Sequence, residues 1–273
     1  MAIITISREL AALGDETAHE LAKLLQYRFV DKLTLEERIK SYGVVERKFE
    51  KYDERKPSFF ASLSQDRDDY LHYLKTAIFA EAGDGNCVFI GRGAGVVLRN
   101  IPGMLSVFLV APADIRCERV KSYFHCDNRR ARQIIEQSDQ DRRGFHRYFF
   151  DIDWKSPDNY HLTLNTGFLH PIIHAELIKN LLENVITTEM EAHSSVKLRE
   201  LTLAQQVVHH ILYEKEIPIH FLEAAVSENA VTLYGVANSQ ALVEAAVSSA
   251  REVPPVAAVR SEIQVVQEYS VMP

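Results

Sequence analysis

The chain has 273 residues, of which 47% are hydrophobic, so it is long enough for two domains and rich enough in apolar side chains to build their cores. Its 31 Lys and Arg residues against 38 Asp and Glu residues give a formal net charge of −7. This balance argues against nucleic acid as the main partner, because phosphate binding requires a basic face.

The charge is unevenly distributed along the chain. Residues 116–147 carry nine Lys and Arg against five Asp and Glu, a local excess of +4. Residues 186–273 carry five basic residues against eleven acidic ones, a local excess of −6. This asymmetry predicts separate roles for the basic centre and the acidic C-terminal part.

The three cysteines, Cys87, Cys117 and Cys126, follow neither the C-x-x-C spacing of zinc sites nor an even-numbered disulfide framework, so we expect reduced thiols and no metal site. The first residues lack the basic, apolar and small-residue pattern of a secretory signal, and no apolar run approaches the ~20 residues of a membrane span. We therefore expect a cytoplasmic protein without a transmembrane segment.

Strand-like and helix-like segments alternate through the first two-thirds of the chain. Apolar runs predict strands over residues 3–7, 87–91, 106–111 and 160–166. Amphipathic patterns predict helices over residues 17–27, 68–82, 112–124 and 171–187, and a long basic pattern predicts a helix outside the sheet over 128–150. Continuous apolar strands that alternate with helices indicate a parallel sheet covered on both faces, which binds ligands at the carboxyl ends of its strands.

A second unit follows a polar stretch that starts near residue 187 and predicts a linker. Beyond it, the patterns predict a helix over 201–213, a strand pair over 220–226 and 231–237, a helix over 239–251 and a last strand over 261–267. This order is typical of a small α+β module.

The run IITISRELAALGDETA, from Ile3 to Ala18, has the order strand, loop, helix with which many folds hold phosphate, because backbone N–H groups and a helix N-terminus converge there. A Walker-type loop would carry Lys at the position of Gly14 and Ser or Thr at that of Asp15. The residues alone leave two interpretations open: a phosphate loop in which Arg8 replaces the lysine, or an ordinary turn in which Arg8 pairs with a nearby acid.

The run FIGRGAGVVL places Arg92 among glycines at the end of a predicted strand. Such glycines let backbone and guanidinium approach a phosphate together, although a tight turn with a surface arginine gives the same pattern. Asp31 follows another short apolar run, where it either faces a substrate or begins a helix.

The run QSDQDRRGFHRYFF carries Asp139, Arg142 and Arg143 within the long basic helix. Arginines on a mobile helical segment bring positive charge over a transferring phosphoryl group when a lid closes. The alternative is a solvated helix face with pairs of opposite charge four residues apart.

Taken together and in this order, the motifs resemble those of the cytidylate kinase-like family, a branch of the P-loop nucleoside monophosphate kinases. The resemblance covers residues 1 to about 185 and rests on the runs ITISREL, YRFVDKLTLEERI, DERKPSF, GNCVFIGRGAGVVL, VFLVAPADIRCERV and DRRGFHRYFFDIDWKSPDNYHLTLNT. It implies a three-layer α/β P-loop fold with a parallel sheet, with ATP and Mg²⁺ as cofactors.

The resemblance also implies roles for single residues. Residues 8–17 match the phosphate-binding loop and the start of its helix, and Arg116 and Arg119 lie on the helix that commonly contributes to ATP binding. Asp31 and Arg92 match positions that bind the monophosphate, and Asp139, Arg142 and Arg143 match the lid. The implied nucleotide contacts are Arg8, Ala11, Ala12, Leu13, Gly14, Asp15, Glu16, Thr17, Arg116 and Arg119, and the implied substrate contacts are Asp31, Gly91, Arg92 and Gly93.

The loop departs from the family pattern, in which SREYGSGG is typical and the Walker lysine is already absent. Here LAALG stands in place of YGSGG, so that Ala11 and Leu13 replace two glycines. The family's activity, ATP-dependent phosphorylation of a pyrimidine nucleoside monophosphate, is therefore expected to be weak or lost. The alternative function is a catalytically silent module that senses a nucleotide or acts as a scaffold.

The C-terminal part is similar to a BON domain in the run VTLYGVANSQALVEAA. We expect a kinase-like domain over 1–187, a linker over 188–196 and a BON-like domain over 197–268. The resemblance implies a protein or phospholipid partner, and the acidic charge of this part favours a role in regulation or assembly over binding to anionic lipid.

Overall fold

The structure is a computed structural model that describes residues 1–42 and 64–266. The motif DERKPSF of the family resemblance lies outside the described residues. The chain divides into two compact units, unit 1 over residues 1–195 and unit 2 over residues 196–273.

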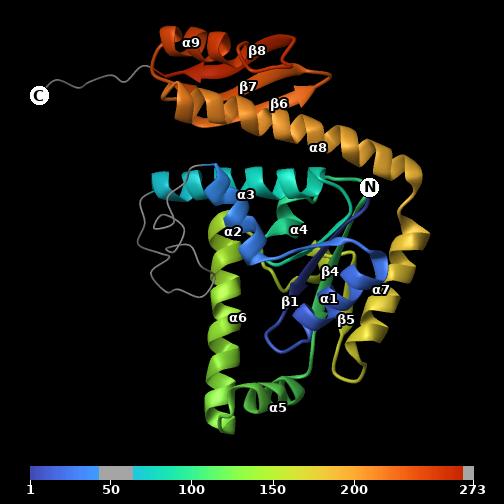
Figure 1. Ribbon diagram of the computed structural model, residues 1–273. Coiled ribbons are helices and arrows are strands. Elements are labelled where there is room, and N and C mark those ends of the chain that lie inside the picture. The colour runs from blue at the N-terminus through green and yellow to red at the C-terminus, as the bar shows by residue number, and fades with distance from the viewer. Residues whose placement is uncertain (43–63, 267–273) are drawn as a thin grey trace, which may run out of the picture. The chain divides into compact units, whose positions relative to one another are not determined.

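Five parallel strands form the sheet of unit 1, in the order β2-β3-β1-β4-β5 (Figure 1). The strands are β1 (Ile3–Arg8), β2 (Arg28–Val30), β3 (Cys87–Ile90), β4 (Met104–Val110) and β5 (Leu162–Asn165). The central strands bury most of their residues, including the polar Thr5 and Ser106, because both of their faces are covered, which is the usual state of a parallel sheet. The parallel sheet predicted from the sequence is confirmed.

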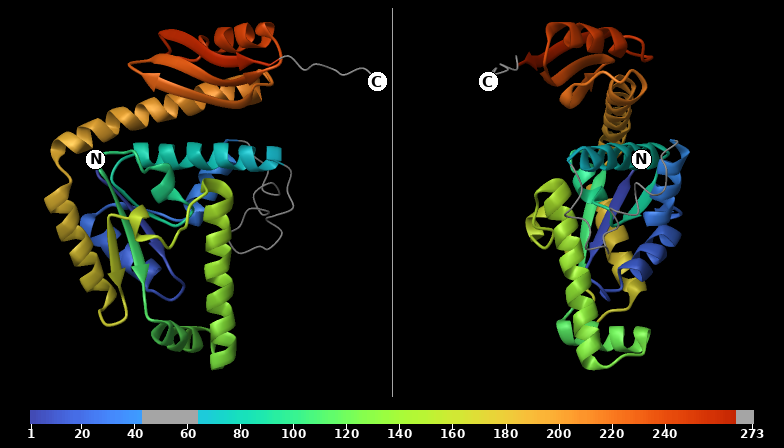
Figure 2. Two further views of the ribbon diagram at one scale, coloured as in Figure 1. Left: turned by 180° about the vertical axis from the view of Figure 1, so that it is seen from behind. Right: turned by 90° about the vertical axis from the view of Figure 1, so that its left-hand side faces the viewer.

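Helices cover both faces of this sheet, which gives three layers (Figure 2). Apolar side chains of α1 and α7, among them Leu21 and Ile178, pack with Ile4 and Val107 on one face. On the other face, Phe108 packs against Trp154 and Tyr160, and α6 packs on α3 through aromatic rings. The helices of unit 1 are α1 (Gly14–Leu25), α2 (Lys32–Ser41), α3 (Ser64–Gly83), α4 (Ala94–Val97), α5 (Ala113–Phe124), α6 (Asn128–Phe150) and α7 (Pro171–Val185).

The strand order fixes where a ligand site can lie. Strand β1 sits between β3 and β4, so the chain moves outward on one side of β1 before it returns to the other side. The loops after β1, β3 and β4 therefore open at one edge of the sheet, and α1, α4 and α5 begin there. Ligands of open α/β sheets bind at this kind of switch point.

Residues 188–196, which the sequence predicts as a linker, form the first part of helix α8 (Thr188–His209). The side chain of Ser194 is fully buried, and its Oγ accepts a hydrogen bond of 2.7 Å from the Gly103 amide, while Glu191 pairs with the N-terminal amine at 3.0 Å. The segment lacks an apolar stripe because a helix that leaves one domain for the next is polar on most of its faces.

Unit 2 contains the end of α8, a three-stranded sheet and helix α9 (Gln240–Ala250). Strands β6 (His220–Ser227) and β7 (Ala230–Ala237) are antiparallel, and β8 (Ala258–Val265) pairs with β7 in parallel. Buried residues of all these elements form one core, which includes Val207, Leu233 and Ala246. The α+β module predicted from the sequence is confirmed.

Burial raises the pKa of the Cys87 thiol to about 12, and all three cysteines are free, which agrees with the expected reduced thiols. No helix within the described residues is long and apolar enough to cross a membrane.

The contacts of Ser194 and Glu191 predict where unit 1 can be cut. A chain that ends at Ser195 is expected to unfold cooperatively and to be more stable than one that ends at Thr187 by about 1–3 kcal/mol, because the shorter chain leaves the Gly103 amide without its acceptor. Urea denaturation of both fragments measures this difference. Ser194→Ala in the longer fragment is the control and should reproduce part of the loss of stability. Equal stability of the two fragments would contradict the assignment of residues 188–195 to unit 1.

Candidate functional site

The loop between β1 and α1 adopts a left-handed backbone at two residues that are not glycine. Ala11 has φ 61° and Leu13 has φ 54°. A left-handed conformation costs a residue with a Cβ on the order of 1 kcal/mol, so contacts elsewhere must impose it. The two residues occupy the positions at which the family pattern has glycine, and the loop therefore keeps a glycine-type backbone with alanine and leucine.

This backbone leaves the start of α1 open to an anion. No side chain caps the helix. In the backbone of the loop, the Ala12 amide donates a hydrogen bond to Glu9 O and the Thr17 amide donates one to Leu13 O. Among residues 1–42 and 64–266, the amide N–H groups of Gly14 and Asp15 have no acceptor. Successive free amides in a turn of alternating handedness at a helix N-terminus form an anion-binding concavity.

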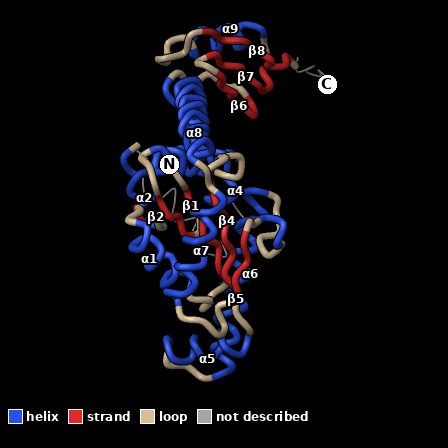
Figure 3. Tube along the Cα trace, turned by 90° about the vertical axis from the view of Figure 1, so that its right-hand side faces the viewer, coloured by secondary structure: helices blue, strands red, loops and turns tan. Residues whose placement is uncertain are grey.

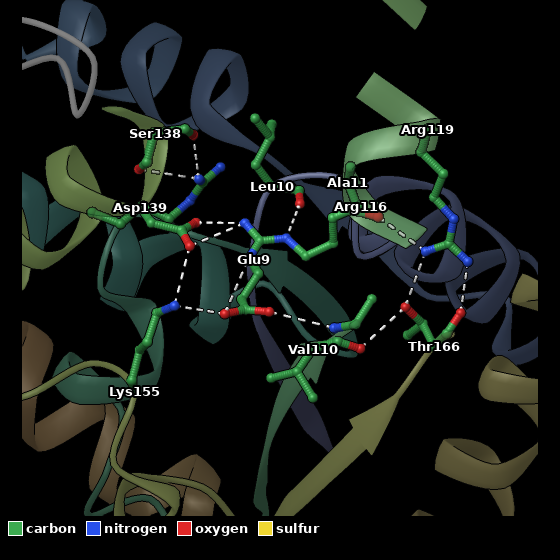
Figure 4. Close-up of polar contacts among 12 residues, drawn as sticks. Glu9, Leu10, Ala11, Val110, Arg116, Arg119, Ser138, Asp139, Lys155 and Thr166 are labelled. Atoms are coloured by element: carbon green, nitrogen blue, oxygen red, sulfur yellow. Dashed lines mark hydrogen bonds and ion pairs between the residues drawn. The ribbon is translucent and has the colours of Figure 1, made fainter. Parts of the chain in front are cut away.

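Two arginines of α5 hold the loop by its carbonyl groups (Figure 4). Arg116 Nε donates to Leu10 O at 2.7 Å, and Arg119 Nη1 donates to Ala11 O at 2.9 Å. Arg119 also reaches Thr166, at the end of β5, through Thr166 O at 2.7 Å. Arg116 and Arg119, predicted as nucleotide contacts, thus bind the loop itself and impose its strained conformation.

Arg116 is also the centre of a group of four charges, of which Arg116 and Glu9 are buried and Lys155 is partly exposed (Figure 4). Its guanidinium is within 2.9 and 3.0 Å of the two Asp139 carboxylate oxygens and 3.2 Å from Glu9 Oε1. Lys155 Nζ lies 2.6 Å from Glu9 Oε1 and 3.1 Å from Asp139 Oδ2. Two cations and two carboxylates balance one another here, and they tie α6 to the loop after β1.

Arg8 lies over Gly14. A Cβ built on Gly14 would be 2.4 Å from Arg8 Cγ and 2.7 Å from Arg8 Cβ, so the stem of Arg8 fills the space in which a side chain of residue 14 would begin. The Arg8 guanidinium is 3.4 Å from Asp15 Oδ1. Arg8 therefore pairs with an acid, as the second interpretation expects, and its role in place of the Walker lysine stays a prediction.

The apolar residues of the loop anchor it in two cores. Ala12 is fully buried in the cluster between the sheet and α1, while Leu10 and Ala11 pack against α5 and α6. Leu13 is half-buried, and the acidic side chains of Asp15 and Glu16 are exposed in the first turn of α1. These two carboxylates interact favourably with the helix dipole, but they repel an anion that binds at the same helix terminus.

A buried histidine supports the first turn of α1 from α7. His174 is fully buried, and its Nδ1 is 3.4 Å from Thr17 Oγ1. Burial lowers the pKa of His174, and the nearby charge of Arg119 lowers it further, which keeps the imidazole neutral. Burial likewise lowers the pKa of Arg119.

The lid arginines of α6 point in different directions. Arg142 is buried, and its Nη1 donates to Ser138 Oγ at 2.5 Å and to Ser138 O at 3.3 Å. Arg143 is exposed. Of the three predicted catalytic residues, Asp139 is bound to Arg116 and Arg142 lies within the protein, so only Arg143 faces solvent.

The predicted substrate residues form a second group after β2 and β3. Gly91, Arg92 and Gly93 all have positive φ, of 73°, 55° and 70°, and Arg92 is buried with its guanidinium 3.3 Å from Glu36 Oε1. A Cβ on Gly93 would lie 2.3 Å from a ring carbon of Phe150, so this glycine lets α6 approach the turn. Asp31 begins α2, where its Oδ1 accepts a 2.9 Å bond from the Thr34 amide.

The family model described as the cytidylate kinase-like family matches residues 3–167, which include the loop, both groups of charged residues and all five strands. The chain belongs to the cytidylate kinase-like family. A BON domain model matches residues 200–267, which make up most of unit 2. Unit 1 is therefore a P-loop kinase-like domain of the cytidylate kinase-like family, and unit 2 contains a BON domain.

Solved structures agree with this fold. A crystal structure of an uncharacterized protein from Eubacterium ventriosum ATCC 27560 matches 67% of this chain and 99% of its own, with 20% identity and a TM-score of 0.55. Shikimate kinase from Acinetobacter baumannii in complex with shikimate matches 68% of this chain and 96% of its own, at 15% identity and a TM-score of 0.40. The second score is too low to carry an argument, and no curated protein matches the chain significantly.

A cavity of about 690 Å³ lies between the loop and the α5–α6 pair, within the range of small-molecule sites. Its walls are Leu10 of the loop, Phe124 of α5 and one side of α6. None of the predicted nucleotide or substrate contacts lines it. The described residues contain no cluster of three or more His, Cys, Asp and Glu side chains that could hold a metal ion.

Two residues of the site were not predicted. Glu9 and Lys155 complete the charge group, but they are 146 residues apart and belong to the end of β1 and to the loop after α6. Glu9 had a weak signal, since it follows a predicted strand. Lys155 had none, because its partners come from distant parts of the chain.

Replacing Arg116 tests the charge group. Arg116→Met is expected to destabilise unit 1 by about 3–5 kcal/mol, because the Glu9 and Asp139 carboxylates lose a charged partner and the bond to Leu10 O disappears. Urea denaturation measures the loss. Arg143→Met on the exposed side of α6 is the control and should change stability by less than about 0.5 kcal/mol. A loss below about 1 kcal/mol for Arg116→Met would show that the loop is held by other contacts.

Replacing Gly14 tests the position of Arg8. Gly14→Ala is expected to cost about 1–3 kcal/mol because the new Cβ overlaps the Arg8 stem. Gly83→Ala is the control: a Cβ there meets nothing within 4 Å, so it should be neutral or stabilising. The double change with Arg8→Ala removes the closest contact and should cost less than the sum of the single changes. Strict additivity would mean that Arg8 does not occupy this space.

Proposed function

We propose that unit 1 binds a nucleotide through its phosphate groups at residues 8–17 and transfers phosphoryl groups weakly or not at all. The observation that carries the proposal is the left-handed backbone of Ala11 and Leu13, with free amides at the start of α1. An ordinary turn of alanine and leucine has no reason to keep this costly conformation. Arg116 and Arg119 maintain it from inside the protein, as a binding loop requires.

The proposed weakness in transfer rests on charge. Phosphoryl transfer depends on cations placed around the transferring group. Residue 14 is a glycine and supplies no cation, and the cations Arg116 and Lys155 are already paired with Asp139. The exposed carboxylates of Asp15 and Glu16 add negative charge at the loop. Arg8 is the cation closest in sequence to the loop, and it is shared with Asp15.

The acceptor proposed from the family is a pyrimidine monophosphate, bound near Arg92. The positive-φ turn of residues 91–93 and the buried guanidinium of Arg92 support a phosphate contact there. Mg²⁺ would arrive with ATP. Asp15 stands where a Walker-type loop has its metal-binding Ser or Thr, so its carboxylate is the oxygen donor that we assign to the ion.

One observation favours a second candidate function, a catalytically silent sensor or scaffold in the cytoplasm whose BON domain binds a partner. Arg116 and Lys155 pair with Glu9 and Asp139 within the protein, so this group of four charges is balanced without a nucleotide. Unit 2 is acidic, which favours a protein partner over anionic phospholipid.

Calorimetry with ATP, ADP and CMP, with and without Mg²⁺, tests binding, and a coupled assay with ATP and a panel of monophosphates tests transfer. We expect ADP and ATP to bind. We expect the rate of phosphoryl transfer to stay below about 1 per second, the low end for kinases. Turnover at ordinary kinase rates would contradict the proposed weakness, and the absence of binding by any nucleotide would favour the scaffold.

Two variants of residue 13 test the loop itself. Leu13→Gly keeps the left-handed backbone and should retain nucleotide affinity, whereas Leu13→Ile introduces a β-branched residue that rarely adopts it and should lower affinity at least tenfold. Equal affinities in the two variants would separate binding from the backbone of residue 13.

A further inference from the structure

The turn between α5 and α6 carries a surface that the proposed nucleotide site does not use. We call it the tip, and it consists of Tyr123 and Phe124 at the end of α5 and of Arg129, Arg130 and Arg132 at the start of α6. Figures 1 and 3 show α5 at one end of unit 1, beyond the carboxyl ends of the strands. The tip joins two large aromatic rings to three cations within ten residues.

The aromatic residues of the tip are exposed to an unusual degree. Tyr123 is 80% exposed and Phe124 50%, and their rings pack edge to face with centroids 5.1 Å apart. Neither ring belongs to an apolar core described for unit 1. Large aromatic side chains side by side in water are favourable only where another surface covers them.

The arginines of the tip have no structural role that accounts for their charge. All three are exposed, and none forms an ion pair in residues 1–42 or 64–266. They lie in the first turns of α6, where the helix dipole disfavours cations, and no acidic residue lies in its first turn. The terminus itself is capped by Asp127, whose Oδ1 accepts a 2.7 Å bond from the Arg130 amide, so an anion at the tip would be attracted by the guanidinium groups.

We propose that the tip binds the surface of an anionic lipid bilayer, with Tyr123 and Phe124 at the headgroup level and the three arginines on lipid phosphates. Exposed aromatic rings flanked by basic residues at the end of an element are suited to the membrane interface. Basic side chains near such a surface gain from its negative potential. The kinase-like unit, and not the acidic BON domain, then makes the contact with the membrane.

The charge pattern favours lipid over nucleic acid. The next charged residues along α6 are Glu136, Asp139 and Asp141, so the positive surface ends after about two helical turns. A strand of nucleic acid needs a basic track that follows its backbone. The tip offers a compact positive end and no such track.

The pattern also favours lipid over unit 2 of a second copy. Unit 2 is acidic, but four of its glutamates already pair within it: Glu200 with Lys197, Glu214 with His210, Glu252 with Lys215 and Glu262 with Arg260. These pairs lower the charge that unit 2 can offer to the tip.

Sedimentation of the full chain with phosphatidylcholine vesicles, with and without about one-third phosphatidylglycerol, tests the proposal. Wild type should bind only the anionic vesicles, and less tightly as salt rises, because surface charges are screened. Arg129→Gln, Arg130→Gln and Arg132→Gln together should lower the partition coefficient roughly 100-fold. Tyr123→Ser with Phe124→Ser should lower it at least tenfold.

The variants carry their own folding control. Gln is a good helix former and removes cations from a helix N-terminus, so the triple variant should melt at the same temperature as wild type or higher. Phe221→Ser with Arg260→Gln removes an exposed aromatic ring and an exposed arginine from unit 2 and should leave vesicle binding unchanged.

Four results would overturn the proposal. Wild type that does not bind anionic vesicles at low salt would exclude a lipid surface, and loss of binding in the unit 2 control alone would move the contact to the BON domain. Tighter binding of single-stranded RNA than of vesicles, or salt-sensitive dimers in ultracentrifugation that the triple variant abolishes, would assign the tip to a different partner.

Discussion

The guanidinium of Arg116 is the interaction on which the site depends. This side chain of α5 binds the carbonyl of Leu10 in the loop, Glu9 at the end of β1 and Asp139 on α6, so three separate segments share one buried cation. A buried charge is costly unless it is paired and hydrogen-bonded, and here each neighbour needs the same partner. The loop, α5 and α6 are therefore positioned together, and a change in one has consequences for the others.

This arrangement separates the shape of a phosphate loop from its charge. The backbone of Ala11 and Leu13 keeps the left-handed turns that glycine usually supplies, and Arg116 and Arg119 hold the two carbonyl groups on either side of Ala11. The positive charge that a kinase directs at phosphate is instead used inside the protein. Shape is sufficient to bind an anion weakly at a helix N-terminus, whereas rapid transfer also requires free cations. In this chain the backbone shape of the loop is kept, whereas the nearby cations are paired within the protein.

Much of unit 1 could be predicted because its strands are covered on both faces and so read as apolar runs. The same holds for the hairpin of unit 2, whose alternation follows from one buried face. The start of α8 gave no such signal, since a polar helix buries little besides Ser194. The charge group was also hidden: Glu9 and Lys155 meet only through the fold, and local sequence says nothing about pairs 146 residues apart. Cytoplasmic location remains a prediction of the sequence.

The resemblance to a family located the phosphate-binding loop, but it could not predict the backbone conformation of the loop or the contacts that hold it. From propensity alone, Ala11 and Leu13 would be expected in right-handed or extended conformations, and the substitution of glycine would be taken as loss of the loop. The structure shows that the conformation is imposed from outside the loop by residues more than one hundred positions away. A missing glycine therefore removes the local preference for a phosphate-binding backbone without removing the backbone itself. Whether a degenerate loop still binds is decided by the contacts around it, and in this chain those contacts come from α5.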